Sequence, residues 1–273
     1  MKVTGSTVDL WLIPPSALDS FCNPADFCLS SEELICAARY AGAGKASWYA
    51  KKQAAVRYVL ASYAECEPSS VCFLYGPQGK PSLPGDGSLE FNLSHSNGYT
   101  VAAVTRGIPI GLDIEYIKSH PRDELAMRIL GPVAAERYCA MNERERSISF
   151  SIAWSEREAL GKMLGFGIGD GWRRVTSIFR PHDLIEIPKS GASRIIGGHA
   201  FYYLNLLPSY SFVFCTCTEI SFVNVNHVRG YDDFVQGGHY KSSDLFVALP
   251  EVPEVSFPSG EPPGAGVYSS APP

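Results

Sequence analysis

The sequence predicts an α+β protein built from two halves that meet near residue 118. Apolar runs with strand-like alternation are grouped separately from longer segments in which apolar residues recur at helical spacing. The groups follow one another as helix, strands, helix and strands, and the pattern changes from strand to helix around residues 118–121. We therefore expect an N-terminal half over residues 1–117 and a C-terminal half over residues 118–228.

The N-terminal half begins with a strand and two helices. Residues 7–13 alternate in hydrophobicity, and the two prolines that follow end the strand. Ser30 followed by Glu33 is the pattern of a capping box, which predicts a short helix to about Tyr40. A second helix is expected after the glycines at 42–44, because these apolar residues keep helical spacing: Ala55, Val56, Val59, Leu60 and Tyr63.

Short strands and turns fill the rest of this half. We expect strands at 71–76, 89–95, 99–105 and 109–117. Asn97-Gly98 and Arg106-Gly107 are typical hairpin turns. Residues 76–87, between the first two of these strands, are expected to form a loop rich in glycine and proline.

The C-terminal half is predicted to begin with helices and to end with strands. Helical patterns cover about 122–130, 132–141 and 147–165. Beyond Gly171 five strands are expected, at 175–179, 183–187, 199–207, 210–218 and 219–225. Residues 229–273 are rich in proline, glycine and serine, and this tail is expected to stay disordered because it has little apolar surface to bury.

Charge and composition exclude several classes of protein. A net charge of −5 over 273 residues argues against a general nucleic-acid or membrane-surface binder, so an anionic ligand would need a local basic cluster. We see neither a basic segment followed by a signal-like apolar run nor about 18 consecutive apolar residues, and we expect a cytoplasmic protein. The eight cysteines and six histidines lack zinc-site spacing, which favours reduced, packed thiols over a zinc enzyme.

The first motif with chemical meaning is GLDIE at 111–115. On a strand, Asp113 and Glu115 point to the same face, while Leu112 and Ile114 occupy the other. Two neighbouring carboxylates repel each other unless a cation lies between them, and hard oxygen ligands suit Mg²⁺. The alternative is a solvated edge strand whose acidic residues are incidental.

The second motif is the helix that contains Trp154, Glu158 and Lys162. Their spacing of four residues places all three side chains on one face. Glu158 could complete a three-carboxylate site, and Lys162 could balance charge on a phosphate. The alternative is a packed helix with a Glu–Lys pair worth only about 0.2–0.5 kcal/mol, but that interpretation leaves the glycines directly after the helix unexplained.

Two further segments could bind phosphate. Ser94 and His95 are adjacent on a strand and cannot form a catalytic dyad with each other, but either could donate to phosphate; an ordinary strand end is the alternative. Lys80 is held beside the rigid Pro81. Basic residues on the early helix are either solvated or part of a phosphate clamp: Lys51, Lys52 and Arg57.

Taken together, four motifs over roughly residues 45–170 resemble the surfactin-type (Sfp-type) 4′-phosphopantetheinyl transferase family. They are GKPSLP at 79–84, FNLSHS at 91–96, GLDIE at 111–115 and WSEREALGKMLGFGI at 154–168. The resemblance implies two similar α+β halves related by a pseudo-twofold axis, with coenzyme A and Mg²⁺ bound between them in a monomer. It implies a holo-[acyl-carrier-protein] synthase that transfers phosphopantetheine to a serine of an acyl, peptidyl or aryl carrier protein and releases 3′,5′-ADP.

The same resemblance implies roles for individual residues. The metal would be held by Asp113, Glu115 and Glu158. The nucleotide and its phosphates would be contacted by Lys52, Arg57, Lys80, Pro81, Ser94 and His95. We hypothesise that Glu158 is the base for the carrier serine and that Lys162 neutralises charge on the transferred phosphoryl group. Arg157 stands where the family usually has lysine, and Trp154 is expected to pack the helix in place.

Two other functions compete with this one. The same carboxylates could serve another Mg²⁺-dependent enzyme that transfers phosphoryl groups or cleaves pyrophosphate. The chain could also be a non-catalytic adaptor that binds coenzyme A or a carrier protein, although the retention of Asp113, Glu115, Glu158 and Lys162 argues against it.

Overall fold

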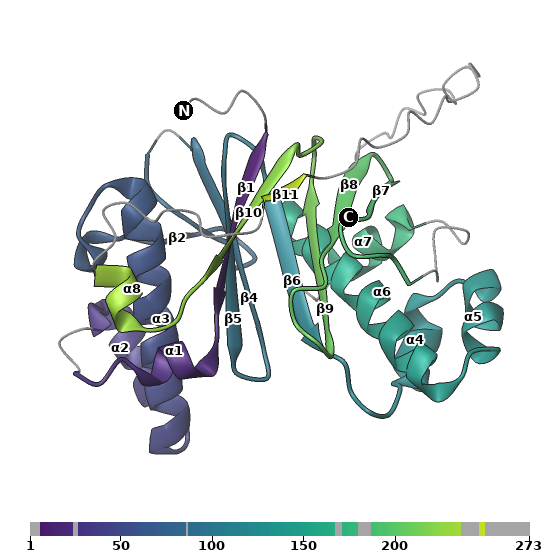
Figure 1. Ribbon diagram of the computed structural model, residues 1–273, viewed down its shortest axis with the longest axis horizontal. Helices are drawn as coiled ribbons and strands as arrows, with labels where there is room; N and C mark the ends of the chain where they lie inside the picture. The colour runs from purple at the N-terminus through teal and green to yellow at the C-terminus, as the bar shows by residue number, and fades with distance from the viewer. Residues whose placement is uncertain are drawn as a thin grey trace, which may run out of the picture.

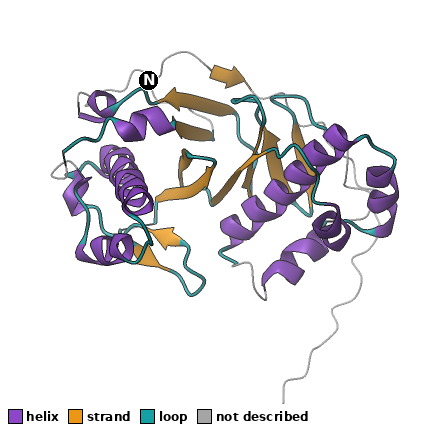
Figure 2. Cartoon of the chain, turned by 90° about the horizontal axis from the view of Figure 1, so that it is seen from below, coloured by secondary structure: helices purple, strands orange, loops and turns teal. Residues whose placement is uncertain are grey.

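Two β-sheets lie face to face at the centre of the protein, and helices cover the outer face of each sheet (Figure 1). Figure 2 shows the strands from below, with the helices on both outer sides. This computed structural model describes residues 6–23, 27–85, 87–166, 171–179, 187–235 and 246–248. The predicted α+β class is confirmed.

Both predicted N-terminal helices form, and two short elements that were not predicted, α1 (Pro15–Asp19) and η2 (Pro68–Ser70), lie before and after them. Strand β1 (Thr7–Ile13) leads into α1, α2 (Ser31–Ala38), α3 (Ala43–Ala64) and the 3₁₀ turn η2. The Ser30 hydroxyl accepts the Glu33 N–H, and the Glu33 carboxylate accepts the Ser30 N–H, which confirms the capping box. Helix α3 packs its alanine and valine face on the first sheet through buried Ala54, Val59 and Leu60.

The middle strands also agree with prediction, with one exception. Strands β4 (Leu89–Ser96) and β5 (Tyr99–Arg106) form a hairpin about Asn97 and Gly98, both with positive φ, and β6 (Ile110–Tyr116) follows. The strand predicted at 71–76 is reduced to β2 (Leu74–Tyr75), which pairs only with β3 (Pro81–Ser82). Proline at the second strand limits this ladder to two residue pairs.

The second half contains α4 (Asp123–Ile129), α5 (Pro132–Cys139), α6 (Glu143–Leu164), α7 (Gly171–Ile178), β7 (Ser193–Ile196), β8 (His199–Tyr203), β9 (Tyr210–Thr216) and β10 (Phe222–His227).

The prediction of a strand at 175–179 is wrong, because most of this segment lies in helix α7. Val175 and Phe179 are four residues apart and pack together against the buried face of α6, which favours a helix despite the β-branched composition. Most of the strand predicted at 183–187 falls outside the described residues, and β7 was not predicted.

The sheets exchange strands between the predicted halves. The first sheet has the order β11-β10-β1-β5-β4 and the second β6-β9-β8-β7. Strand β6 therefore pairs with C-terminal strands, and β10 returns to lie parallel to β1, so the strands do not divide at residues 117 and 118. Part of the segment predicted to be disordered is ordered, as α8 (Tyr231–Val235) and β11 (Phe246–Ala248), because β10 offers an edge to β11.

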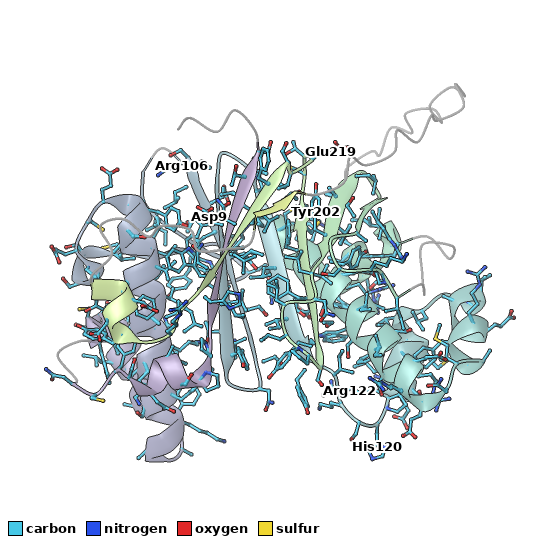
Figure 3. All side chains as sticks on the ribbon, viewed as in Figure 1. Asp9, Arg106, His120, Arg122, Tyr202 and Glu219 are labelled. Atoms are coloured by element: carbon cyan, nitrogen blue, oxygen red, sulfur yellow. The ribbon has the colours of Figure 1, made fainter. Side chains whose placement is uncertain are left out.

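The main core lies between the two sheets. Leu10 and Val101 from the first sheet meet Leu112, Ile114 and Phe214 from the second, all nearly inaccessible to solvent. Tyr202, labelled in Figure 3, stacks on Phe214 with ring centroids 4.7 Å apart. Burial of this apolar surface contributes roughly 25 cal/mol per Å² and holds the two sheets against each other, so it determines where β6 lies.

Gly111 allows α6 to approach β6, and its replacement should destabilise the protein. A Cβ at this position would overlap the Ala159 carbonyl oxygen and press on the Met163 amide nitrogen, both on α6. We expect Gly111→Ala to lower the free energy of unfolding by about 1–3 kcal/mol in chemical denaturation. The control is Gly44→Ala near the start of α3, where a Cβ meets nothing within 4 Å; equal destabilisation by both variants would contradict this explanation.

Candidate active site

A row of polar side chains on β4 joins the edges of the two sheets. Asn92, Ser94 and Ser96 alternate along β4 and so point to one side of it. Each accepts a backbone N–H from β6, at 2.9, 3.3 and 2.9 Å: from Leu112, Ile114 and Tyr116 respectively. We call these three hydrogen bonds the β4–β6 seam. They explain the alternation of polar residues in FNLSHS.

Asp113 and Lys162 meet beside this seam. Lys162 Nζ donates to Asp113 Oδ1 at 2.7 Å, to Ser94 Oγ at 3.0 Å and to the Leu112 carbonyl at 3.0 Å. Ser94 Oγ donates to the same Asp113 oxygen at 2.9 Å. Asp113 is only 4% exposed, so the ammonium supplies charge compensation that water cannot. The helix face and the strand face predicted from the sequence are therefore brought together.

Glu115 and Glu158 are half-buried near this pair. Burial raises the pKa of Glu158, the negative charges of Asp113 and Glu115 add to the rise, and Lys162 opposes it. Burial also raises the pKa of Glu115, with Asp113 adding to it, while Ser96 Oγ lies 3.4 Å from its carboxylate. The three carboxylates are thus close enough to influence one another electrostatically.

The carboxylates do not form a closed metal site by themselves. The described residues contain no group of three or more histidine, cysteine, aspartate or glutamate side chains that could hold a metal ion. However, Asp113 Oδ2 and Glu158 Oε1 are buried and lack a hydrogen-bond partner among the residues that the structure describes. Buried anionic oxygens are costly unless a ligand meets them. This donor set fits Mg²⁺, which combines one or two protein carboxylates with water and phosphate oxygens.

Two basic side chains, Lys52 and His95, contact the Trp48 ring, and His95 is near enough to Lys162 and Asp113 to be influenced by their charges. The His95 ring lies 5.3 Å from the Trp48 ring, and Lys52 Nζ lies 5.3 Å from the same indole. Burial lowers the pKa of His95 to about 4, with the charges of Lys52 and Lys162 adding to the effect and Asp113 opposing it. Burial also lowers the pKa of Lys52. An anion placed here would relieve this repulsion.

Lys80 extends from the β2–β3 hairpin to the C-terminal end of α6. Its Nζ donates to the Met163 carbonyl at 2.9 Å, in the last turn of α6, and burial lowers its pKa. Pro81 begins β3 directly after it and pairs with Tyr75, so the base of the lysine side chain is anchored. Gly165, with φ of 72°, ends α6 beside the Lys80 side chain. Gly167 lies outside the described residues.

Two arginines considered from the sequence lie away from the site. Arg57 was predicted to contact phosphate, but it is 2% exposed and binds Glu33 at 2.8 Å. It also donates to the carbonyls of Pro68 and Val71, so we correct this prediction: Arg57 joins α2 and α3 to the following turn. Arg157 is 1% exposed and donates to the Ala153 and Ile129 carbonyls, which ties α6 to α4.

Trp154 packs among aromatic side chains, whereas Trp48 contacts the basic residues Lys52 and His95. Trp154 packs between Phe150 and Trp172, with ring centroids 6.1 and 5.0 Å away, which agrees with the expected packing role. Trp48, which sequence reasoning missed, supports both Lys52 and His95. Its spacing of four residues from Lys52 on a helix was the available signal.

Comparison with known proteins identifies the family. Residues 109–205 match the family described as the 4′-phosphopantetheinyl transferase superfamily. The 4′-phosphopantetheinyl transferase HetI of Nostoc sp. strain PCC 7120 is 32% identical over 172 residues, 62% of this chain and 73% of HetI. The 4′-phosphopantetheinyl transferase Sfp of Bacillus subtilis strain 168 is 31% identical over 114 residues, 41% of this chain and 50% of Sfp.

A further relative of the same class is the Synechocystis sp. protein slr0495, 31% identical over 150 residues. The matched segment covers 54% of this chain and 61% of that relative, which is less than two thirds of its length. An α+β fold with neighbouring carboxylates and lysines defines a class suited to phosphorylated ligands. More particularly, the chain belongs to the 4′-phosphopantetheinyl transferase superfamily, and the predicted surfactin-type resemblance is confirmed.

Within the residues that the structure describes, we find no helix of sufficient length and apolar character to span a membrane.

The lowered pKa of His95 predicts a pH-dependent stability. Between the ordinary value of 6.5 and the folded value of about 4, the unfolded chain binds the proton more readily than the folded protein. Stability should therefore fall as pH falls through this window, by less than about 1 kcal/mol because His95 remains partly exposed. Urea denaturation at pH 7 and pH 5 should show a smaller loss for His95→Gln.

The control for this comparison is His227→Gln, which removes an exposed histidine on β10. It should lose as much stability between the two pH values as the wild-type protein. If His95→Gln shows the same or a larger loss than the wild type, the lowered pKa of His95 does not account for the pH dependence of stability.

Proposed function

We propose that this protein transfers the 4′-phosphopantetheine arm of coenzyme A to a serine hydroxyl of an acyl, peptidyl or aryl carrier protein and releases 3′,5′-ADP. The observation that carries the proposal is the placement of Asp113, Glu115 and Glu158 beside Lys162, in a member of the 4′-phosphopantetheinyl transferase superfamily. Coenzyme A carries a pyrophosphate and a 3′-phosphate, and the surrounding lysines offer the opposite charge.

The carboxylates would hold Mg²⁺. Asp113 Oδ2 and Glu158 Oε1 are the available oxygens, since both are buried without a partner among the described residues; Glu115 lies near enough to share the charge. When bound, Mg²⁺ would neutralise charge on the pyrophosphate and lower the energy of the departing 3′,5′-ADP. The donors are all oxygens, which suits this metal.

The basic residues would bind the nucleotide. Lys52 and His95 share the Trp48 ring, and Lys80 lies at the end of α6. A phosphate here would gain charge-assisted hydrogen bonds, and His95 would then favour its protonated form. Pro81 fixes the backbone from which Lys80 extends. The Ser94 hydroxyl is already shared by Asp113, Lys162 and the Ile114 N–H, so its contact with the nucleotide stays a prediction.

Glu158 would act as the base in the transfer step. Its carboxylate would take the proton of the carrier serine, directly or through a water, while the serine oxygen attacks the β-phosphorus. The bond between that phosphorus and the oxygen of 3′,5′-ADP then breaks, and the negative charge leaves with the nucleotide. Lys162 lies one turn from Glu158 and would neutralise the charge that builds on the transferred phosphoryl group, although in the ligand-free protein it contacts Asp113.

We further propose that the enzyme works as a monomer in the cytoplasm. The carboxylates and the lysines all come from one chain, so no second copy is required to complete the site.

Removal of a carboxylate should abolish transfer. We expect Asp113→Ala and Glu158→Gln each to reduce transfer at least about 100-fold, because each removes an orphaned oxygen that the reaction would use. The measurement is the mass increase of a purified apo-carrier protein incubated with coenzyme A and MgCl₂, together with the 3′,5′-ADP released. Circular dichroism should show that each variant is folded, and Glu136→Gln on the exposed face of α5 is the matched control.

The same assay separates the rival functions. Release of 3′,5′-ADP without modification of any carrier in a panel would favour another phosphoryl-transfer or pyrophosphate-cleaving enzyme. Binding of coenzyme A without turnover would favour an adaptor. Near-normal transfer by either carboxylate variant would exclude the metal-binding and base roles proposed for these residues.

A further inference from the structure

The Ser94 hydroxyl has no hydrogen-bonding capacity left for a further ligand. A serine hydroxyl can donate one hydrogen bond and accept two. Ser94 Oγ donates to Asp113 Oδ1 at 2.9 Å. It accepts from the Ile114 N–H at 3.3 Å and from Lys162 Nζ at 3.0 Å. Because Ser94 is only 5% exposed, a contact between this hydroxyl and a nucleotide would break one of three bonds in a place nearly closed to solvent.

These bonds hold Asp113 through only one of its two carboxylate oxygens. Oδ1 accepts from Ser94 Oγ and, at 2.7 Å, from Lys162 Nζ. The lysine also donates to Ser94 and to the Leu112 carbonyl, so all three of its protons are engaged. Oδ2 is buried and has no hydrogen-bond partner among the described residues. The carboxylate is therefore fixed in one orientation, with Oδ2 left for a ligand.

The next serine of β4 repeats this arrangement around the second carboxylate of β6, the neighbouring strand at the centre of the molecule (Figure 1). Ser96 Oγ accepts the Tyr116 N–H at 2.9 Å and donates to Glu115 Oε2 at 3.4 Å. As with Ser94 and Asp113, the serine bonds the N–H of one β6 residue and the carboxylate of the residue before it. The repeat of two residues matches the alternation of side chains along both strands.

We propose that Ser94 is a positioning residue, which holds Asp113 by Oδ1 and so leaves Oδ2 to bind Mg²⁺. The inference rests on the function proposed above, and it gives Ser94 a role different from the nucleotide contact that the sequence predicts. A side chain that bonds a metal ligand, rather than the metal, orients that ligand and raises metal affinity. Ser96 supports Glu115 in the same way but more weakly, because its bond is longer and both residues are only partly buried.

Metal affinity and nucleotide affinity separate the two roles of Ser94, and both are measured without a carrier protein. Isothermal titration calorimetry of coenzyme A in EDTA gives the Kd of the nucleotide. Electron paramagnetic resonance of MnCl₂, with coenzyme A at a saturating concentration, gives the Kd of the metal. We expect Ser94→Ala to raise the Kd of Mn²⁺ about tenfold and to leave the Kd of coenzyme A in EDTA within about twofold of the wild-type value.

Two variants distinguish the hydroxyl from the packing of the strands. Ser94→Thr keeps the hydroxyl and should return the Kd of Mn²⁺ to within about threefold of the wild-type value. Asn92→Ala removes the seam bond to the Leu112 N–H, where the preceding residue is Gly111 and offers no carboxylate. This control should lower the urea midpoint about as much as Ser94→Ala does and leave the Kd of Mn²⁺ unchanged.

Should Ser94→Ala fail to fold, Ser94→Cys takes its place. The thiol is a weaker donor and acceptor than the hydroxyl, so the Kd of Mn²⁺ should rise by a smaller factor in the same direction. Unchanged Mn²⁺ affinity in this variant would count against the inference as it would in Ser94→Ala.

Three outcomes would overturn the inference. A raised Kd of coenzyme A with an unchanged Kd of Mn²⁺ in Ser94→Ala would assign the hydroxyl to the nucleotide. An equal loss of Mn²⁺ affinity in Asn92→Ala, or no recovery in Ser94→Thr, would leave Ser94 with a structural role alone. A wild-type protein that binds Mn²⁺ and coenzyme A but modifies no carrier would instead contradict the proposed function and leave the role of Ser94 standing.

Discussion

The β4–β6 seam is the interaction on which the site depends. Three side chains of β4 satisfy backbone N–H groups of β6, so the edges of two different sheets are held together without a continuous ladder. Because Ser94 belongs to the seam and also bonds Asp113, the same contact that joins the sheets orients a carboxylate. Loss of the Ser94 hydroxyl would thus disturb structure and site together.

Helix α6 supplies the other side of the site, and it can do so only because β6 has glycine at its point of closest approach. With α6 pressed onto β6, Lys162 reaches Asp113, and Glu158 lies near both carboxylates of the strand. The result is a site of mixed charge beside the C-terminal part of α6, in which Lys162 contacts Asp113 and Glu158 lies one turn before Lys162. This arrangement is suited to a ligand that carries several phosphates.

The sequence was a good guide where one element determined the geometry. Asp113 and Glu115 share a strand face, and Glu158 and Lys162 share a helix face, so their approach needed only the packing of two elements. The sequence was a poor guide for Arg57, because the residues around it give no sign that its guanidinium donates to Glu33 and to the carbonyls of Pro68 and Val71. It also misassigned 175–179, where packing against α6 outweighed a β-rich composition.

The sequence by itself determined the class of fold, the strand and helix that carry the carboxylates, and the family to which the chain belongs. The tertiary structure alone decided which sheet each strand joins, with β6 placed among C-terminal strands and β10 beside β1. It also decided that Ser94 belongs to the seam and that Asp113 Oδ2 is left without a partner in the described chain. The reason is physical: periodicity reports which face of an element is buried, whereas strand pairing and hydrogen-bond partners depend on residues far apart in sequence.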